Sequence, residues 1–196
     1  MDKFLLLCYT IPVWAYRPSS TLYEGARNNM PFSPLPGIMT DSLTDLTPEL
    51  LQEHGIRLLM LDFDNTIVPY TTDVPTKEME EWLSAMQASP IQLCVVSNSH
   101  KDRVKVFCRA RGLDCITHAK KPFSKGIREC LQKYGVPADH AALVGDQIYT
   151  DTLGANGCGV LPILIKAIDN HNFWLKARHV LELPFIFIAR NRRITK

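Results

Sequence analysis

Four aspartates follow short apolar runs in this sequence, and their spacing is its first indication of chemistry. Asp62 and Asp64 alternate at the end of one apolar run, so both side chains would leave the same face of a strand. Asp146 and Asp151 follow a later run. Two carboxylates about 4 Å apart repel by roughly 4 kcal/mol at an effective dielectric near 20, so such a cluster favours a bound dication. All-oxygen ligation favours Mg²⁺ over Zn²⁺; the predicted ligands are Asp62, Asp64 and Asp146, supported by Asp151.

A carboxylate in this setting can attack a phosphoryl group, which splits one difficult displacement into formation and hydrolysis of an acyl phosphate. Asp62 suits that role, and Asp64 can protonate the leaving oxygen and later deprotonate the attacking water. Polar groups at other strand ends can hold the phosphate oxygens and neutralise their charge. The predicted phosphate-binding residues are Thr66, Ser97, Asn98 and Lys121. These residues predict a Mg²⁺-dependent phosphomonoester hydrolase with an aspartyl-phosphate intermediate.

The elements that must position these residues alternate between apolar runs and amphipathic stretches, a pattern typical of an α/β fold with a parallel sheet. The predicted strands are 58–63, 91–96, 115–117, 141–144 and 160–165. The predicted helices are 79–86, 101–111 and 124–134, the last with Ser124 as its N-cap and Gly135 at its end, followed by a helical tail after 165. Ligands of open parallel sheets bind at the carboxyl ends of the strands, where the polar residues above fall.

Four segments in chain order resemble the motifs of the haloacid dehalogenase (HAD) superfamily. They are LDFDNT at 61–66, VVSNS at 95–99, KKP at 120–122 and VGDQIYTD at 144–151. Over residues 35–180 the chain is similar to the YqeG type of HAD phosphatase, subfamily IIIA, on the segments LTPELLQEHGIRLLMLDFDNTIVPY, SNS, AKKP and GDQIYTDTLGAN. The resemblance implies a Rossmann-like three-layer HAD fold with a parallel central sheet, in a phosphatase domain at 35–196. It also favours Lys121 over Lys120 as phosphate binder, because Lys121 directly precedes Pro122.

The spacing of these motifs leaves no room for a cap domain. Between 66 and 97, and again between 98 and 121, the chain holds only a loop, a helix and a strand. In this superfamily an uncapped, open site is associated with large or surface-bound phosphoesters. Since YqeG-like proteins resemble the mitochondrial phosphatase of phosphatidylglycerophosphate, a phospholipid headgroup is one candidate substrate. A nucleotide, a sugar phosphate and a phosphoprotein are the alternatives.

Two other classes of protein could use similar residues. A receiver-like signalling module also combines acids, a phosphorylatable Asp, a hydroxyl and a Lys, but its phosphorylated Asp ends a later strand than its acidic pair. Here the candidate nucleophile and acid/base belong to one DxD. A phosphate-binding pseudo-enzyme would lack part of the site, and no required group is missing. Both comparisons favour the hydrolase.

Composition narrows the partners and the compartment. With 22 Lys and Arg against 20 Asp and Glu, the net charge is +2, so no nucleic-acid partner is expected. The six cysteines form no CxxC pair, and a reducing cytoplasm fits them best. The sequence carries no indication of oligomeric state.

Residues 1–34 are predicted to form an irregular N-terminal extension. Its apolar part, 4–15, is shorter than the roughly 20 residues that a membrane-spanning helix needs and has no clear cleavage site. Met30 is an alternative start, which would leave 1–29 outside the native protein.

The C-terminal tail combines apolar residues with terminal positive charge. Trp174 and the run 183–187 precede Arg190, Arg192, Arg193 and Lys196, a composition that could rest on anionic lipid as a peripheral membrane contact. A terminal helix packed on the sheet is the favoured alternative.

Overall fold

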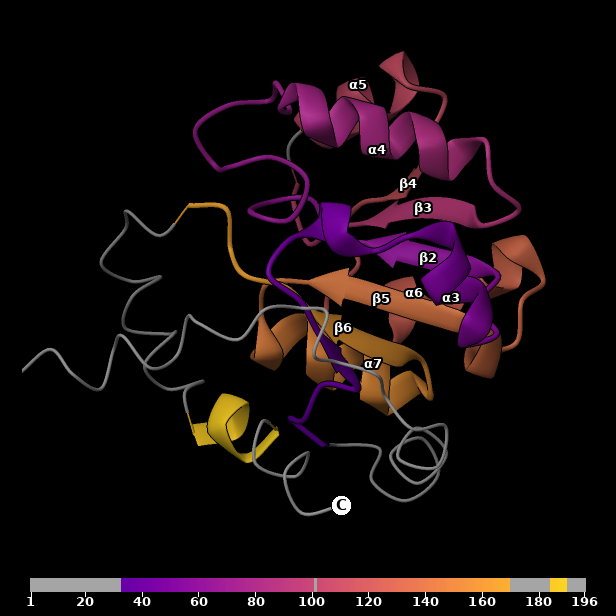
Figure 1. Ribbon diagram of the computed structural model, residues 1–196, viewed down its shortest axis with the longest axis vertical. Helices are drawn as coiled ribbons and strands as arrows, with labels where there is room; N and C mark the ends of the chain where they lie inside the picture. Colours follow the sequence, from indigo (N-terminus) through magenta and orange to yellow (C-terminus); the bar gives the residue numbers. More distant parts are fainter. Residues whose placement is uncertain (1–32, 101, 170–183, 190–196) are drawn as a thin grey trace, which may run out of the picture.

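The chain folds around one parallel β-sheet. A computed structural model describes residues 33–100, 102–169 and 184–189, and within them six strands pair in the order β1-β6-β5-β2-β3-β4 (Figure 1). The strands are β1 (Ile38–Met39), β2 (Leu58–Leu61), β3 (Gln92–Val96), β4 (Asp114–Ile116), β5 (Ala141–Gly145) and β6 (Leu161–Leu164). All neighbouring strands are parallel. The predicted strands are therefore confirmed, with bounds that differ by a few residues.

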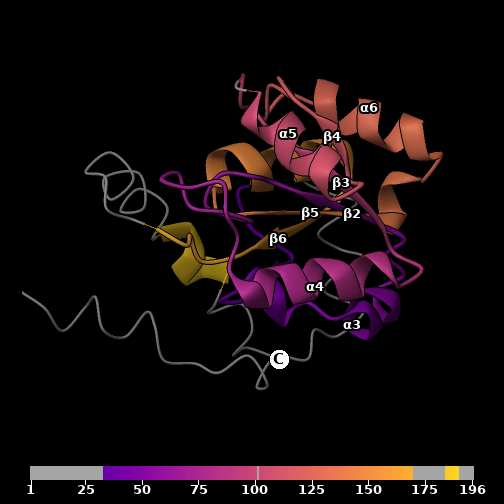
Figure 2. The same cartoon turned by 90° about the horizontal axis from the view of Figure 1, so that it is seen from above.

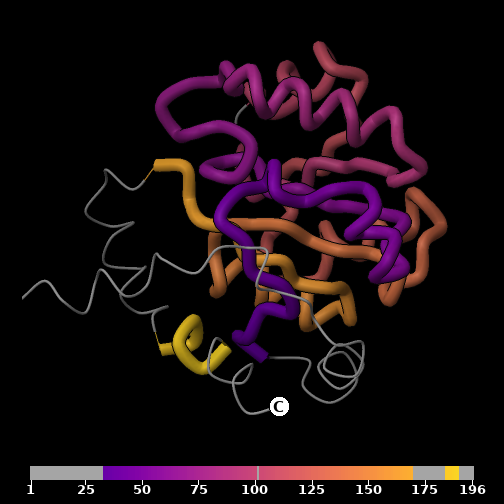
Figure 3. The backbone as a smooth tube through the Cα atoms, in the orientation of Figure 1, coloured from indigo at the N-terminus to yellow at the C-terminus, as the bar shows by residue number. Residues whose placement is uncertain are grey.

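The central strand β2 brings the predicted site to one edge of the sheet. Every residue of β2 is buried, as expected for a strand covered on both faces. Leu61 lies beside Val95 of β3 and Val144 of β5, and the Asp62 amide donates a hydrogen bond to the Val144 carbonyl (2.9 Å). The residues that follow β2, β3 and β5 thus emerge together at the carboxyl edge, the edge to which the strand arrows of Figure 1 point; Figure 3 traces the same backbone as a tube.

Helices cover both faces of the sheet and complete the predicted three layers. They are η2 (Leu43–Asp45), α3 (Pro48–Glu53), α4 (Lys77–Gln87), α5 (Arg103–Ala110), α6 (Lys125–Tyr134), η3 (Ala138–His140), η4 (Ile148–Thr152) and α7 (Leu153–Cys158). The side chains of Leu59 and Leu61 pack in one core with α3 and α4, whereas Leu58 and Met60 pack in a second core with α6 and α7. Figure 2 shows α3 and α4 on one side of the sheet and α6 on the other.

Helix α4 illustrates how the apolar spacing positions an element. Met79, Trp82, Leu83 and Met86, at positions i, i+3, i+4 and i+7, are all buried against the sheet. Thr76 caps the helix by accepting a hydrogen bond from the Met79 amide (3.2 Å). The indole N–H of Trp82 also donates to the Leu46 carbonyl (2.7 Å), so α4 is tied to the segment before α3 as well as to the core.

Helix α6 ends at the predicted glycine, but the predicted capping hydrogen bond at its start is absent. Gly135 follows it with a φ of 62°, the left-handed conformation that favours glycine. Ser124 occupies the N-cap position, yet its side chain makes no capping hydrogen bond. The reason is its helical backbone (φ −74°, ψ −8°), because capping side chains reach the first turn from an extended conformation. The capping role predicted for Ser124 is therefore wrong.

The connections between the strands are short, and the described residues contain no inserted cap domain. Only a loop and α4 separate β2 from β3, and α5 alone lies between β3 and β4. Six of the described elements had no predicted counterpart: the two-residue edge strand β1, the helices η2, α3, η3 and α7, and the π-helical turn η4. The five described cysteines are free thiols, while Cys8 lies outside the described residues.

Part of the C-terminal tail packs on the sheet, as the favoured alternative predicted. Residues 184–189 are helical, and Ile186 is buried in a small cluster with Ile148 and Leu164. Among the described helices, none is both long and apolar enough to cross a lipid bilayer. The predictions for Trp174, the basic residues 190–196, the extension through residue 32 and the alternative start at Met30 lie outside the described residues.

Candidate active site

Three buried carboxylates meet at the carboxyl edge of the sheet. Asp62 follows β2, Asp146 follows β5, and Asp151 lies in η4. Each offers an oxygen within 4.8 Å of the others, and the three residues are 6%, 6% and 2% exposed. Buried carboxylates at such distances repel strongly unless a cation lies among them. This acidic cluster could therefore bind a divalent metal.

One protein cation already lies against the acidic cluster. The Lys121 ammonium donates a hydrogen bond to Asp62 Oδ1 (2.6 Å) and forms an ion pair with Asp151 Oδ1 (2.7 Å), and its side chain is 1% exposed. Three carboxylates against one ammonium leave an excess of two negative charges when all are ionised. That excess equals the charge of one dication, and the all-oxygen donor set suits a hard ion such as Mg²⁺.

The pKa values of Asp62 and Lys121 reflect this excess of negative charge. Burial is the main cause that raises the pKa of Asp62 from 3.8 to about 7; Lys121 opposes it, and Asp151 and Asp64 add to it. Burial lowers the pKa of Lys121, but the charges of Asp151 and Asp62 outweigh it and leave the pKa raised. Without further positive charge, Asp62 therefore gains a proton readily while Lys121 stays charged.

The backbone of Lys121 is fixed by Asn98. The side-chain oxygen Oδ1 of Asn98 accepts a hydrogen bond from the Lys121 backbone amide (2.7 Å), and the Asn98 side-chain N–H donates to the Lys121 backbone carbonyl (2.9 Å). The peptide between Lys121 and Pro122 is cis. Lys120, the other lysine of this segment, is exposed, whereas Lys121 is buried. Asn98, predicted as a phosphate binder, thus uses both side-chain polar atoms to hold a lysine that borders the acidic cluster.

Asp151 is held by hydrogen bonds within its own turn and by the space beside Gly145, the last residue of the preceding strand β5. Its Oδ2 accepts hydrogen bonds from the Gln147 amide (3.2 Å) and the Thr150 hydroxyl (3.3 Å). A Cβ on Gly145 would lie 2.3 Å from this carboxylate, much closer than real Cβ atoms approach. The glycine before Asp146 therefore provides the space that the Asp151 side chain occupies. The π-helical turn η4 carries Asp151 into that space, which is consistent with the frequent use of such turns at functional sites.

The carboxylate of Asp64 pairs with an arginine and is not part of the acidic cluster. Asp64 Oδ1 lies 3.1 Å from the Arg103 guanidinium, and the two side chains are 18% and 15% exposed. The predicted metal set of Asp62, Asp64 and Asp146 thus differs from the observed cluster, in which Asp151 takes the third place. Sequence spacing assigned Asp151 only a supporting role and did not indicate Arg103 as a partner of Asp64, because spacing does not show how far a turn carries a side chain.

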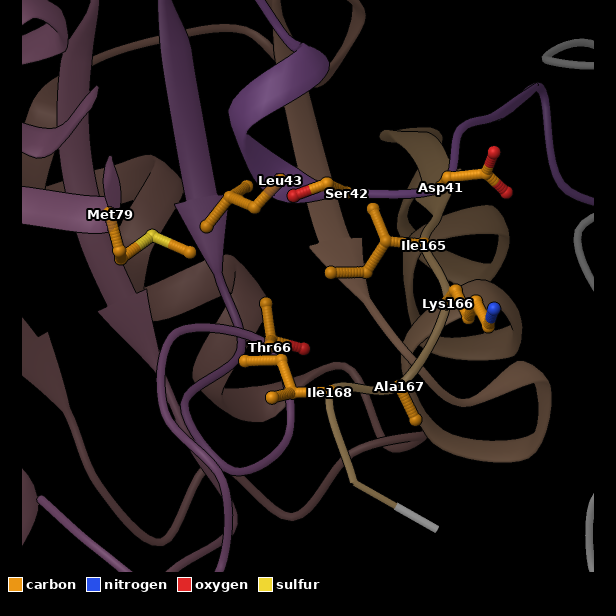
Figure 4. Close-up of a pocket in the computed structure, with 9 residues that line it drawn as sticks. All are labelled: Asp41, Ser42, Leu43, Thr66, Met79, Ile165, Lys166, Ala167 and Ile168. Carbon is orange, nitrogen blue, oxygen red and sulfur yellow. The ribbon is translucent and has the colours of Figure 1, made fainter. Parts of the chain in front are cut away.

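The two remaining predicted phosphate binders lie in different surroundings. Ser97 is 1% exposed at the end of β3, and its hydroxyl accepts a hydrogen bond from the Ser99 amide (3.0 Å). Thr66 is fully buried and lines a separate pocket of about 280 Å³ (Figure 4). The pocket is lined by Asp41, Ser42, Leu43, Thr66, Met79, Ile165, Lys166, Ala167 and Ile168. None of these is an acid of the cluster.

Known proteins resemble this chain over most of its length. The family model described as mitochondrial PGP phosphatase matches residues 29–168. A protein named probable phosphatase YqeG, from Bacillus subtilis (strain 168), is 31% identical over 134 residues, covering 68% of this chain and 78% of that protein.

Among solved structures, an uncharacterized protein from Listeria monocytogenes serotype 4b has a TM-score of 0.49 at 17% identity, covering 60% of this chain and 84% of that one. The cobalt-bound deoxy-D-mannose-octulosonate 8-phosphate phosphatase from Haemophilus influenzae has a TM-score of 0.47 at 14% identity, covering 66% and 89%. The family match and the Bacillus relative each span more than half of the chain, and the family match at residues 29–168 includes all four acids. The protein therefore belongs to the PGP phosphatase family and is a HAD-type phosphatase.

Proposed function

We propose that this protein is a Mg²⁺-dependent phosphomonoester hydrolase that forms an aspartyl-phosphate on Asp62. The observation that supports the proposal is the burial of three neighbouring carboxylates, two of them paired with the Lys121 ammonium, with an excess of negative charge. Asp62, Asp146 and Asp151 would hold the ion. When bound, Mg²⁺ supplies positive charge that offsets the charge growing on the phosphate oxygens.

The protein's own groups divide the remaining work in the first half-reaction. Lys121 and Ser97 bind phosphate oxygens, and Asn98 contributes by fixing the Lys121 backbone. A carboxylate oxygen of Asp62 forms a bond to phosphorus as the bond between phosphorus and the leaving oxygen breaks. Asp64 gives its proton to that oxygen, so the product leaves as an alcohol.

The second half-reaction restores the enzyme. Asp64, now a carboxylate, takes a proton from a water molecule whose oxygen forms a bond to phosphorus. The bond between Asp62 and phosphorus breaks, and inorganic phosphate leaves. Both aspartates end in the state in which they began, so no further reactant is needed.

We propose phosphatidylglycerophosphate as the physiological substrate. The family description supports it, as does a site with no inserted domain over it among the described residues. Three exposed apolar side chains follow site residues closely in the chain: Tyr70 and Val74 after Asp64, and Phe123 after Lys121. They are 43%, 74% and 73% exposed. Apolar side chains in such loops could contact the glycerol and acyl parts of a lipid.

The mechanism is tested by phosphate release from p-nitrophenyl phosphate with Mg²⁺ or with EDTA. We expect activity only with the metal, and we expect Asp62→Asn to lower kcat by at least about 10³-fold because the nucleophile is lost. Mass spectrometry of acid-quenched protein should detect a phosphate adduct on Asp62. Turnover in EDTA, or turnover retained by Asp62→Asn, would exclude the mechanism.

The substrate is tested by a panel that contains a nucleotide, a sugar phosphate, a phosphopeptide and phosphatidylglycerophosphate in mixed micelles. We expect the highest kcat/KM for the lipid. A higher value for any other member would replace the lipid as the proposed substrate while leaving the hydrolytic mechanism intact.

A further inference from the structure

Arg103, the first residue of α5, connects the DxD segment to the loop that follows it. Its guanidinium lies 3.1 Å from Asp64 Oδ1, and its Nε forms an ion pair with Asp73 Oδ1 at 2.8 Å. The same guanidinium donates hydrogen bonds to the carbonyl of Tyr70 (3.3 Å) and, at the limit of such a bond, to that of Pro69 (3.5 Å). One side chain thus contacts Asp64 and three residues of the loop at 69–73.

An aromatic ring also supports the guanidinium. The central carbon of the guanidinium lies 5.1 Å from the centre of the Phe63 ring, which is fully buried. The Arg103 side chain is only 15% exposed, so its ion pair with Asp64 is screened less by solvent than a surface pair. Arginine suits this place because its planar group presents several donors in fixed directions, whereas a lysine ammonium acts as a single point charge.

We propose that Arg103 is a positioning residue: by holding Oδ1 of Asp64 it fixes the carboxyl group so that the other oxygen, Oδ2, carries the proton to the leaving oxygen, and it holds the loop at 69–73 beside it. This role rests on the proposed function of Asp64. The turn that carries Asp64 is already tight, since the Asn65 amide donates to the Val68 carbonyl (2.7 Å). Arg103 adds the side-chain contact that this backbone turn does not supply.

The reaction offers a way to separate positioning from general stability. In the first half-reaction the proton on Asp64 moves to the leaving oxygen while the bond to phosphorus breaks. An alkyl leaving group needs that proton, whereas p-nitrophenolate leaves readily as an anion. A misplaced Asp64 should therefore slow the release of alcohols much more than the release of p-nitrophenol.

The experiment compares kcat/KM for glycerol phosphate and p-nitrophenyl phosphate, because kcat/KM reports the steps up to departure of the leaving group. A misplacement near 1 Å can cost about 100-fold, so we expect Arg103→Ala to lower kcat/KM about 100-fold for glycerol phosphate and at most about threefold for p-nitrophenyl phosphate. Arg103→Lys should restore part of the loss, to within about tenfold of the unaltered protein, because it keeps the charge but not the fork.

Arg111 provides a matched control at the other end of the same helix. It follows α5, pairs with Glu80 of α4 and lies over the Phe107 ring at 3.9 Å, so it repeats the ion pair and the ring contact away from the DxD. Arg111→Ala should leave the ratio of the two kcat/KM values unchanged, even where it lowers Tm.

Three results would overturn the proposal or its basis. Equal losses on both substrates in Arg103→Ala would show a role in the fold and not in proton transfer. If Arg103→Ala does not fold, Arg103→Lys decides: an unchanged ratio in that variant would reject the positioning role. No turnover of either substrate by the unaltered protein would instead reject the proposed function, and the positioning role with it.

Discussion

Replacement of Lys121 by methionine tests whether the acidic cluster needs internal positive charge. Methionine keeps an unbranched side chain of similar length but removes the ammonium that lies 2.6 Å from Asp62 and 2.7 Å from Asp151. The side chain is 1% exposed, so water cannot replace the lost contacts without a rearrangement of the site. We therefore expect a large loss of stability when no metal is present.

The expected magnitude follows from this burial. Removal of one partner from a buried ion pair costs about 3–5 kcal/mol, because the other charge is left uncompensated. In a protein of this size 1 kcal/mol changes Tm by about 2–4 °C, so the loss corresponds to about 6–20 °C. At pH 5 the loss should shrink, since the raised pKa of Asp62 lets that carboxyl take up a proton in the folded state.

The assay is urea unfolding of Lys121→Met in EDTA at pH 8 and pH 5, with the unaltered protein beside it. Lys133→Met is the matched control, because Lys133 pairs with Asp114 at 2.7 Å while both side chains are nearly half exposed. An exposed pair of this kind contributes at most about 1 kcal/mol. Equal stability losses for the two variants at pH 8 would refute the argument that Lys121 balances buried charge.

Two further predictions concern the same cluster. The pKa of the Asp62 carboxyl is about 7 in the folded protein and 3.8 ordinarily, so between these pH values the folded state binds more protons than the unfolded state. In EDTA the free energy of unfolding should therefore fall by about 4 kcal/mol as pH rises from about 4 to about 7. Saturating Mg²⁺ should remove most of this fall in urea titrations, and a rise in stability over that range would contradict the assigned burial of charge. Gly145→Ala places a Cβ 2.3 Å from the Asp151 carboxylate and should weaken Mg²⁺ affinity about 10–100-fold, measured by calorimetric titration. An unchanged affinity would show that Asp151 does not help to hold the ion.

Local sequence patterns predicted the central architecture because the contacts that decide it are periodic. The run before Asp62 is apolar at every position and is buried on both faces, whereas the helical spacing from Met79 to Met86 buries one face; such patterns specify strands and helices without knowledge of their partners. The DxD acids likewise follow a strand whose end must lie at the ligand-binding edge of a parallel sheet. The edge strand β1 escaped prediction because two residues are too few to show a period.

Tertiary structure decided how the polar groups are shared among partners. The sequence named Asp64 among the metal ligands and Asp151 only as their support; in the structure η4 and the space beside Gly145 bring Asp151 into the cluster, while Arg103 pairs with the Asp64 carboxylate. Asn98 looked like a phosphate ligand, yet it holds the backbone of Lys121 from 23 positions away in the chain. Such pairings depend on distances of a few ångströms between segments far apart in sequence, and side-chain spacing along one element does not contain that information.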